Sequence, residues 1–259
     1  MRRCRGASVR ESLATIELVA HRGNAAEFPE NTLPAFESAA RLGCRWLECD
    51  VQLAADGVPF VVHDVDLQRT AGPSMNILQT VSRDVDAVEA AETARFGPRF
   101  AGTRLPRLTA LAAWLESWPG PSLFVELKRA SLLHHGRQVC LDAADRALAS
   151  VRDRCVIISF DLEVLPPARR RGYRIGWVLP RYDDATLAAL GELQPEFVFC
   201  DHQRLPADGP LPAGTWEWAC YEVQSAALAR ALHDRGVGFI ETMEVARLTR
   251  ELAAGAASA

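Results

Sequence analysis

Two acidic residues lie two positions apart in the apolar run LECDVQL, and the next apolar run of the chain is followed by a histidine, His63. Glu48 and Asp50 share one face of a strand, because side chains alternate between its two faces. A DG turn signal then joins this run to a second one, Val58–Val62, which ends on His63. Two ionised carboxylates held close together repel each other unless a cation lies between them. Oxygen ligands of this kind favour Mg²⁺ or Ca²⁺ over zinc.

Other reactive residues lie at the ends of further apolar runs. His21 ends the first run, and Glu126 near the end of the run SLFVEL would add a third carboxylate. Imidazole titrates near neutral pH, so His21 and His63 are candidates for a general acid and a general base. Phe160 follows another run and is predicted to contact an apolar part of a substrate.

Two fixed cations accompany these acids. Arg22 directly follows His21, Lys128 stands two positions after Glu126, and the charges of both suit the binding of phosphate. A second interpretation is that Arg22, Arg45 or Lys128 neutralises the acids in an ion-pair network. The residues alone leave both roles open.

Eight short apolar runs alternate with longer segments rich in Ala and Leu, so we predict parallel strands separated by helices. Eight such units in about 250 residues favour a closed (β/α)8 barrel of the TIM type, in which the strands' carboxyl ends converge on one rim. Candidate residues far apart in sequence then become neighbours. The predicted strands are Leu18–His21, Trp46–Leu53, Ser122–Leu127, Val156–Phe160, Arg174–Val178, Phe197–Cys200, Trp216–Tyr221 and Gly238–Glu241.

The run Val58–Val62 does not belong to the eight strands. We predict that it forms an antiparallel hairpin with the second strand, which brings His63 level with the two acids at the mouth of the barrel. Residues 64–106 are too long for an ordinary connection and predict a small insertion that caps the mouth. We expect one catalytic domain over 16–252, between a flexible leader (1–15) and a flexible tail (253–259).

The composition excludes several classes of protein. The net charge is −4 and no basic block is interleaved with aromatic residues, which disfavours nucleic-acid binding. No apolar run is long enough for a transmembrane helix, and the segment MRRCRGASVRESLAT lacks the apolar core of a signal peptide. Seven cysteines without a CxxC pair disfavour a disulfide framework or structural zinc and indicate a reducing, cytoplasmic setting. The sequence does not indicate an oligomeric state.

Taken together and in this order, these residues resemble the glycerophosphodiester phosphodiesterase family. The resemblance is close over residues 17–160 and looser beyond. The pieces that carry it are HRG at His21, PENTLPAF at Pro29, ECDV at Glu48, DGVPFVVHD at Asp56, RTAG at Arg69, LPRL at Leu105, ELK at Glu126 and ISF at Ile158.

The resemblance implies a TIM-type barrel and a divalent metal on the residues that match Glu48, Asp50 and Glu126. It implies that the residues matching His21 and His63 serve as general acid and base. It also implies that Arg22 and Lys128 are phosphate-side cations. Glu30, in the PEN piece, matches a residue of the mouth that is often placed in the metal or substrate site.

We therefore predict metal-dependent hydrolysis of small glycerophosphodiesters to sn-glycerol 3-phosphate and an alcohol such as choline or ethanolamine. Many relatives have a Thr-Asp pair and a Val-Asn pair where this chain has IETMEV and WACYEV, so the preferred alcohol stays open. One alternative is a related barrel phosphodiesterase that acts on another lipid or headgroup. A second is a barrel that binds phosphorylated ligands without turnover, as fold alone does not establish function.

Overall fold

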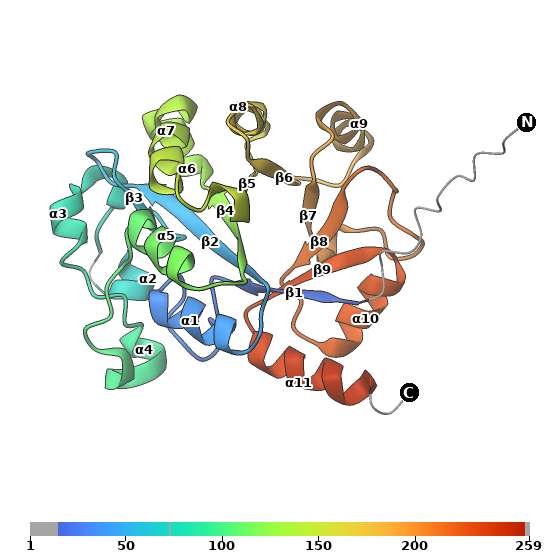
Figure 1. Ribbon diagram of the computed structural model, residues 1–259, viewed down its shortest axis with the longest axis horizontal. Helices are drawn as coiled ribbons and strands as arrows, with labels where there is room; N and C mark the ends of the chain where they lie inside the picture. Colours follow the sequence, from blue (N-terminus) through green and yellow to red (C-terminus); the bar gives the residue numbers. More distant parts are fainter. Residues whose placement is uncertain (1–14, 73, 257–259) are drawn as a thin grey trace, which may run out of the picture.

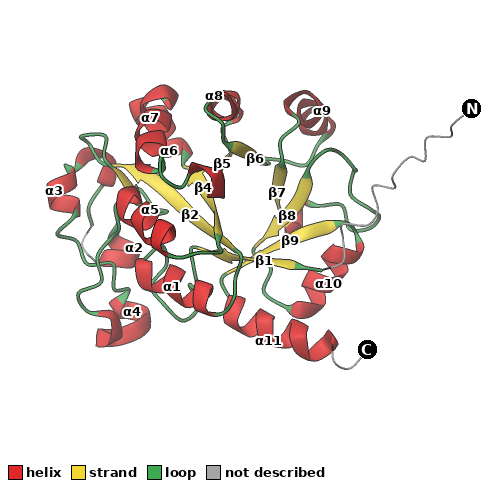
Figure 2. Ribbon diagram, viewed as in Figure 1, coloured by secondary structure: helices red, strands yellow, loops and turns green. Residues whose placement is uncertain are grey.

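Eight parallel strands form a closed ring in the computed structural model, which describes residues 15–72 and 74–256. Each strand pairs with its neighbours in parallel, and pairing of β1 with both β9 and β2 closes the ring (Figure 2). The predicted TIM barrel is confirmed. The strands are β1 (Glu17–His21), β2 (Trp46–Leu53), β4 (Ser122–Leu127), β5 (Cys155–Ser159), β6 (Arg174–Val178), β7 (Phe197–Asp201), β8 (Glu217–Tyr221) and β9 (Val237–Thr242).

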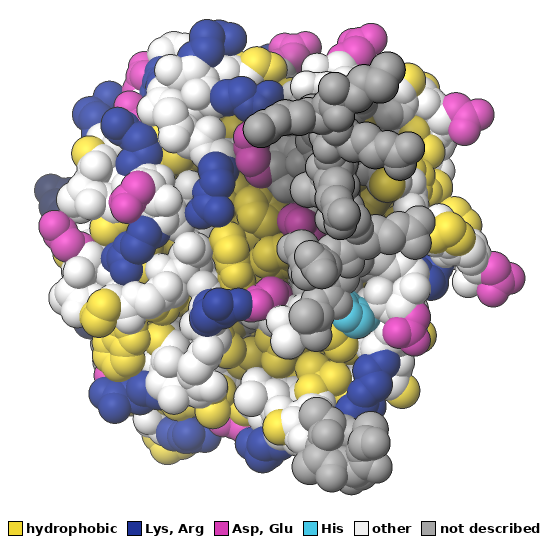
Figure 3. Space-filling model, turned by 45° about the vertical axis from the view of Figure 1, so that its right-hand side comes forward, with side chains coloured by type: hydrophobic (Ala, Val, Ile, Leu, Met, Phe, Trp, Pro, Cys, Tyr) yellow, Lys and Arg dark blue, Asp and Glu magenta, His cyan; other side chains and the backbone are white. Residues whose placement is uncertain are grey.

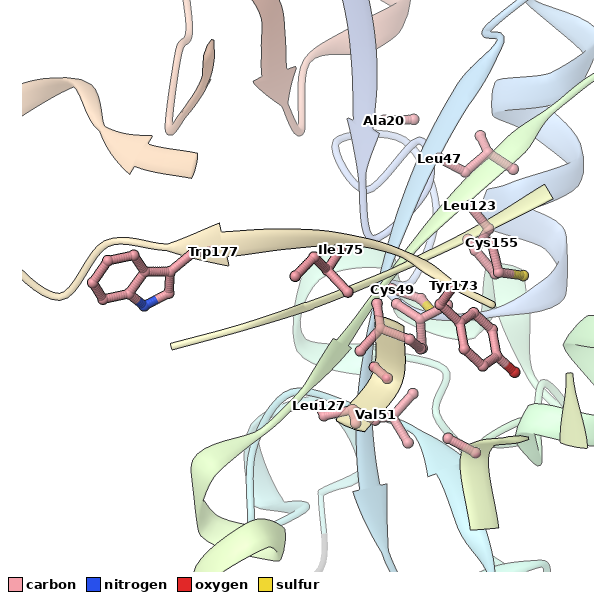
Figure 4. Close-up of a cluster of buried hydrophobic side chains, with 14 of the residues drawn as sticks. Ala20, Leu47, Cys49, Val51, Leu123, Leu127, Cys155, Tyr173, Ile175 and Trp177 are labelled. Atoms are coloured by element: carbon pink, nitrogen blue, oxygen red, sulfur yellow. The ribbon is translucent and has the colours of Figure 1, made fainter. Parts of the chain in front are cut away.

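Side chains alternate along each strand and so supply two separate cores. Leu47, Cys49 and Val51 of β2 point outward into the layer that packs the barrel against its helices (Figure 4). Glu48 and Asp50 therefore face the barrel interior. The cysteines in the described residues carry no disulfide and are buried, as expected of thiols acting as small apolar side chains.

Aromatic rings fill the barrel interior beneath the acids. The Phe124 ring lies 4.8 Å from that of Trp46 and 4.9 Å from that of Phe197, measured between centroids. Phe239 completes the group at 5.2 Å from Trp46. Edge-to-face and stacked contacts of this kind add to the free energy gained by burial. We refer to Trp46, Phe124, Phe197 and Phe239 as the aromatic floor.

Helices surround the ring, most of them where the sequence predicts them. Asp183 and Ser225 cap α9 and α10, because their side chains accept hydrogen bonds from backbone N–H groups in the first turn. Several helices were not predicted: α6, the short helices of the insertion, and α11, which extends over 253–256 of the expected tail. The expected leader, apart from Thr15, and residues 257–259 lie outside the described residues. The helices are α1 (Leu33–Arg41), α5 (Leu108–Ser117), α6 (Arg129–His135), α7 (Arg137–Ala147), α8 (Leu165–Arg170), α9 (Asp184–Leu193), α10 (Ala226–Asp234) and α11 (Val245–Ala256).

The strand β3 (Pro59–Val61) pairs antiparallel with β2 outside the ring, as the turn signal predicts. In the described residues, the insertion that follows contains three short α-helices and two 3-10 helices, and it has a small core of its own, which includes Leu67, Ile77 and Val85. It lies on one side of the barrel, beside α1 and α5 (Figure 1). The short helices are α2 (Gln68–Ala71), α3 (Ser82–Val85) and α4 (Thr93–Phe96).

The surface carries both signs of charge. On the face shown in Figure 3, Lys and Arg side chains are interspersed with Asp and Glu side chains. Within the described part of the chain, no helix is both long and apolar enough to cross a membrane.

Replacing the central ring of the aromatic floor tests its contribution to stability. Phe124 is fully buried, and we expect Phe124→Ala to lower the free energy of unfolding by about 3–5 kcal/mol, because it leaves a cavity under the acids. Urea denaturation measures the change. Leu133→Ala is the control, since Leu133 is 69% exposed and should cost less than about 0.5 kcal/mol. Equal losses in the two variants would contradict the assignment.

Candidate active site

A cavity of about 160 Å³ opens at the carboxyl ends of the strands. It has a charged half, supplied by β1, β2, β4, β9 and the hairpin, and a mostly apolar half, supplied by β5 to β8. Six predicted charged or imidazole residues and Phe160 are brought together there, although they come from separate parts of the chain. The lining residues are His21, Arg22, Glu48, His63, Glu126, Lys128, Ile158, Phe160, Val178, Phe199, Tyr221, Glu222 and Glu241.

The HRG piece shapes the rim next to β1. Arg22 has a φ of 58° and Gly23 a φ of 82°, so the chain turns sharply after His21. A side chain at Gly23 would place its Cβ 2.7 Å from the backbone of Ala35, so α1 can pack closely only against glycine. The turn directs the backbone N–H of Arg22 to Glu48 Oε2, at 3.1 Å. Strained backbone of this kind is typical of functional sites.

Asp50 is fully buried and is held by two cations. Its Oδ2 lies 3.0 Å from Arg22 Nε, and its Oδ1 lies 3.1 Å from Lys128 Nζ. Asn31 adds a hydrogen bond from its Nδ2, at 2.9 Å. Burial favours the protonated carboxyl, but Lys128 and Arg22 outweigh it and hold the pKa of Asp50 well below its usual range. Asp50 is therefore an anion at neutral pH.

The negative charges of Glu48 and Glu126, the other two predicted metal ligands, are less fully compensated by nearby cations. Lys128 Nζ lies 3.1 Å from Glu126 Oε1, and burial together with Asp50 still raises the pKa of Glu126 to about 7. Burial, Asp50 and Glu241 raise the pKa of Glu48 well above its usual range. A shortage of positive charge thus remains in the cavity.

The donor set fits a hard divalent cation. One oxygen each from Glu48, Asp50 and Glu126 lies within 4.8 Å of the others. Apart from their contacts with Lys128, Asp50 Oδ1 and Glu126 Oε1 accept no hydrogen bond from the described residues. Three carboxylates with free oxygen positions are ligands that Mg²⁺ or Ca²⁺ prefers.

The two histidines differ in environment. His21 is 8% exposed, its Nδ1 has no hydrogen-bond partner among the described residues, and burial together with Arg22 lowers its pKa to about 3. His63 lies at the edge of the cavity, where Nδ1 is 2.7 Å from Asp64 Oδ1. Gln52 fixes the backbone there by donating from Nε2 to the carbonyl oxygen of His63, at 2.9 Å.

Glu30 links the site to the insertion. Its carboxylate accepts from Arg22 Nη1 at 2.9 Å and from two nitrogens of Arg69 at 2.7 Å each. Its backbone N–H donates to Glu92 Oε1, at 2.6 Å. None of residues 65–106 in the described part of the chain lines the cavity, and the insertion contacts the rim through Arg69 and Glu92.

Three side chains that contact Asp50 or Glu30 were not predicted as site residues: Asn31, Arg69 and Glu92. Asn31 and Arg69 lie inside the PENT and RTAG pieces, so those motifs carried a signal. Glu92 has no such signal. The ion-pair alternative also receives partial support, because Arg22 and Lys128 do compensate Asp50 and Glu126. Arg45 does not take part, since it pairs with Glu17 at the amino ends of the strands.

The model of the glycerophosphoryl diester phosphodiesterase family matches residues 21–171, more than half of the chain. The chain belongs to this family. The match begins at His21 and includes every candidate site residue, and it confirms the predicted enzyme class, a phosphoric diester hydrolase.

Members of the glycerophosphoryl diester phosphodiesterase family are similar to this chain to different extents. A glycerophosphodiester phosphodiesterase of Caldanaerobacter subterraneus is 30% identical over 63% of this chain and 69% of its own. Glycerophosphodiester phosphodiesterase 1 of the rat is 33% identical over 36% of this chain but only 28% of its own length. An Oleispira antarctica phosphodiesterase, solved with the product sn-glycerol 3-phosphate, superposes with a TM-score of 0.80 at 21% identity, covering 92% of this chain and 96% of that one.

The raised pKa of Glu126 predicts how stability depends on pH in the presence of a chelator. Its pKa is raised from 4.5 to about 7, so the folded state binds a proton that the unfolded state has released, and stability falls as pH rises between these values. Relative to wild type, Glu126→Gln should gain about 3 kcal/mol between pH 4.5 and pH 7. Urea denaturation across this range measures the difference. The exposed Glu116→Gln variant should follow wild type, and a pH-independent difference for Glu126→Gln would contradict the prediction.

Proposed function

We propose that this chain hydrolyses glycerophosphodiesters to sn-glycerol 3-phosphate and an alcohol, with a single catalytic domain over 16–252. The observation that carries the proposal is the meeting of His21 and His63 with three clustered carboxylates at one cavity. Family membership supports the reaction class. The product bound to the Oleispira antarctica phosphodiesterase has the chemistry proposed for the product here.

Glu48, Asp50 and Glu126 would hold Mg²⁺ or Ca²⁺. When bound, such a cation supplies positive charge that polarises the phosphate and offsets charge developing in the transition state. Arg22 and Lys128 face the same cavity and would bind the non-bridging phosphate oxygens. Glu30 orients the Arg22 guanidinium through the 2.9 Å hydrogen bond. Phe160 would contact an apolar part of the substrate.

The histidine environments suggest a division of roles. His21 is neutral at pH 7 because its pKa is lowered to about 3, so it can accept the proton of the attacking hydroxyl as a P–O bond forms. At His63, the Nδ1–Asp64 contact leaves Nε2 to protonate the leaving oxygen as the second P–O bond breaks. Two attackers fit this scheme: water, which gives the products directly, and a neighbouring glycerol hydroxyl, which gives a cyclic phosphate first.

A second candidate is a phosphodiesterase that acts on another lipid or headgroup. It is favoured by the chain's departures from its relatives, because WACYEV and IETMEV place Tyr221, Glu222 and Glu241 in the lining of the cavity. A barrel that only binds phosphorylated ligands is less well supported, since both histidines and all three acids are present.

Removing either histidine tests the acid–base proposal. We expect His21→Ala and His63→Ala each to lower kcat by about 10²–10⁴-fold, because each loses one proton transfer. His134→Ala is the matched control, since His134 is an exposed residue at the end of α6. Thermal unfolding checks that the variants fold. Turnover near wild type in both site variants would sink the assignment.

Removing the divalent cation tests the metal and the substrate together. Release of sn-glycerol 3-phosphate from glycerophosphocholine, followed by a coupled assay, should stop with chelator and return with excess Mg²⁺ or Ca²⁺. Added sn-glycerol 3-phosphate controls for loss of the coupling enzymes. Full turnover in chelator would contradict the metal proposal. Release from other lipid diesters alone, in the presence of cation, would favour the second candidate.

A further inference from the structure

Glu241 is a buried residue whose carboxyl has no hydrogen-bond partner among the described residues. It lies near the end of β9, is 4% exposed and lines the cavity. No group among the described residues forms a hydrogen bond or an ion pair with its side chain; its backbone carbonyl accepts from Val223 N–H, at 3.3 Å. Native structures rarely leave a buried polar group unsatisfied, so this carboxyl calls for an explanation.

The other acids of the site have ion-pair or hydrogen-bond partners. Asp50 and Glu126 have ion pairs with Lys128, Glu30 has Arg22 and Arg69, and Glu48 accepts from a backbone N–H. Burial of an uncompensated carboxyl is costly in free energy. A ligand that enters the cavity and donates a hydrogen bond would remove part of this cost.

The neighbours of Glu241 indicate which kind of ligand that is. One ligand atom each from His21, Glu48 and Glu241 lies within 4.8 Å of the others. A phosphate oxygen beside two carboxylates would be repelled, whereas Arg22 and Lys128 offer it a better position. A hydroxyl group is suited to this place, because it donates to a carboxylate and exchanges hydrogen bonds with a protonated carboxyl. Burial, with Glu126 and Asp50, raises the pKa of Glu241, and a hydroxyl fits either state.

We infer that Glu241 binds a free hydroxyl of the glycerol portion of the substrate, next to His21, and selects for diesters that carry this group. The inference rests on the proposed function and adds to it a specificity-determining residue that comes from the chain's own IETMEV segment. A site built to bind a hydroxyl discriminates strongly against an analogue that lacks it, because its polar group is then left unpaired.

The affinities of two phosphate monoesters distinguish hydroxyl binding by Glu241 from other roles of this residue. Calorimetry with sn-glycerol 3-phosphate and with n-propyl phosphate, at saturating Mg²⁺, compares ligands that differ only in their hydroxyls. Wild type should prefer sn-glycerol 3-phosphate. Glu241→Ala should weaken that ligand about tenfold, the loss of one good hydrogen bond, and leave n-propyl phosphate unchanged. Glu116→Gln, at an exposed position of α5 that does not line the cavity, is the control and should change neither.

The remaining outcomes are equally informative. Equal weakening of both ligands, or a lower Mg²⁺ affinity in Glu241→Ala, would overturn the inference and make Glu241 a cation ligand. No change in either ligand would also overturn it. If Glu241→Ala does not fold, Glu241→Gln keeps the shape and should reduce the same preference by a smaller factor. If wild type shows the hydroxyl preference but hydrolyses no glycerophosphodiester, the proposed function fails while this inference stands.

Discussion

Compensation of buried carboxylates is the constraint on which the rest of this structure depends. Asp50 lies inside the barrel with no exposure, and the pairing with Lys128 and Arg22 is the main reason that it stays ionised there. Those two cations must arrive from opposite sides. Arg22 does so because the backbone after β1 takes a left-handed turn, and Lys128 because it directly follows β4. The geometry of the rim is therefore set by where charge has to be neutralised.

The barrel interior separates this charged layer from an apolar one. The aromatic floor occupies the same inward face of the strands as Glu48, Asp50 and Glu126, but nearer their amino ends. The floor keeps the acids in a setting of low polarity, where desolvation raises the pKa values of Glu48 and Glu126. Packing and electrostatics are thus coupled: the rings that stabilise the barrel also make its acids ready to take up a cation or a proton.

Strand positions and the residues at their ends were predictable from the sequence, because alternation along LECDVQL and SLFVEL reports directly on which side chains share a face. The hairpin was predictable from its turn. Helices α6 and α11 were not, because their segments lack clear start and stop signals. The contacts of Glu30 with Arg69 and Glu92 depend on how the insertion folds, which no local pattern encodes. The role of Glu241 was not predicted for the same reason, because its position next to His21 and Glu48 depends on how the ring assembles.

The contacts of Glu30 have a consequence for how this fold can be recombined. One carboxylate holds Arg22 on one side and Arg69 on the other, so the insertion and the rim share an acceptor. A chimera that exchanged this segment for that of another family member would keep the barrel's own strands intact. Unless the donor segment brought its own counterparts of Arg69 and Glu92, the graft would leave Glu30, one of the two acidic partners of Arg22, with fewer contacts. An exchange of this segment therefore has to preserve both partners of each contact, those on the rim and those on the insertion.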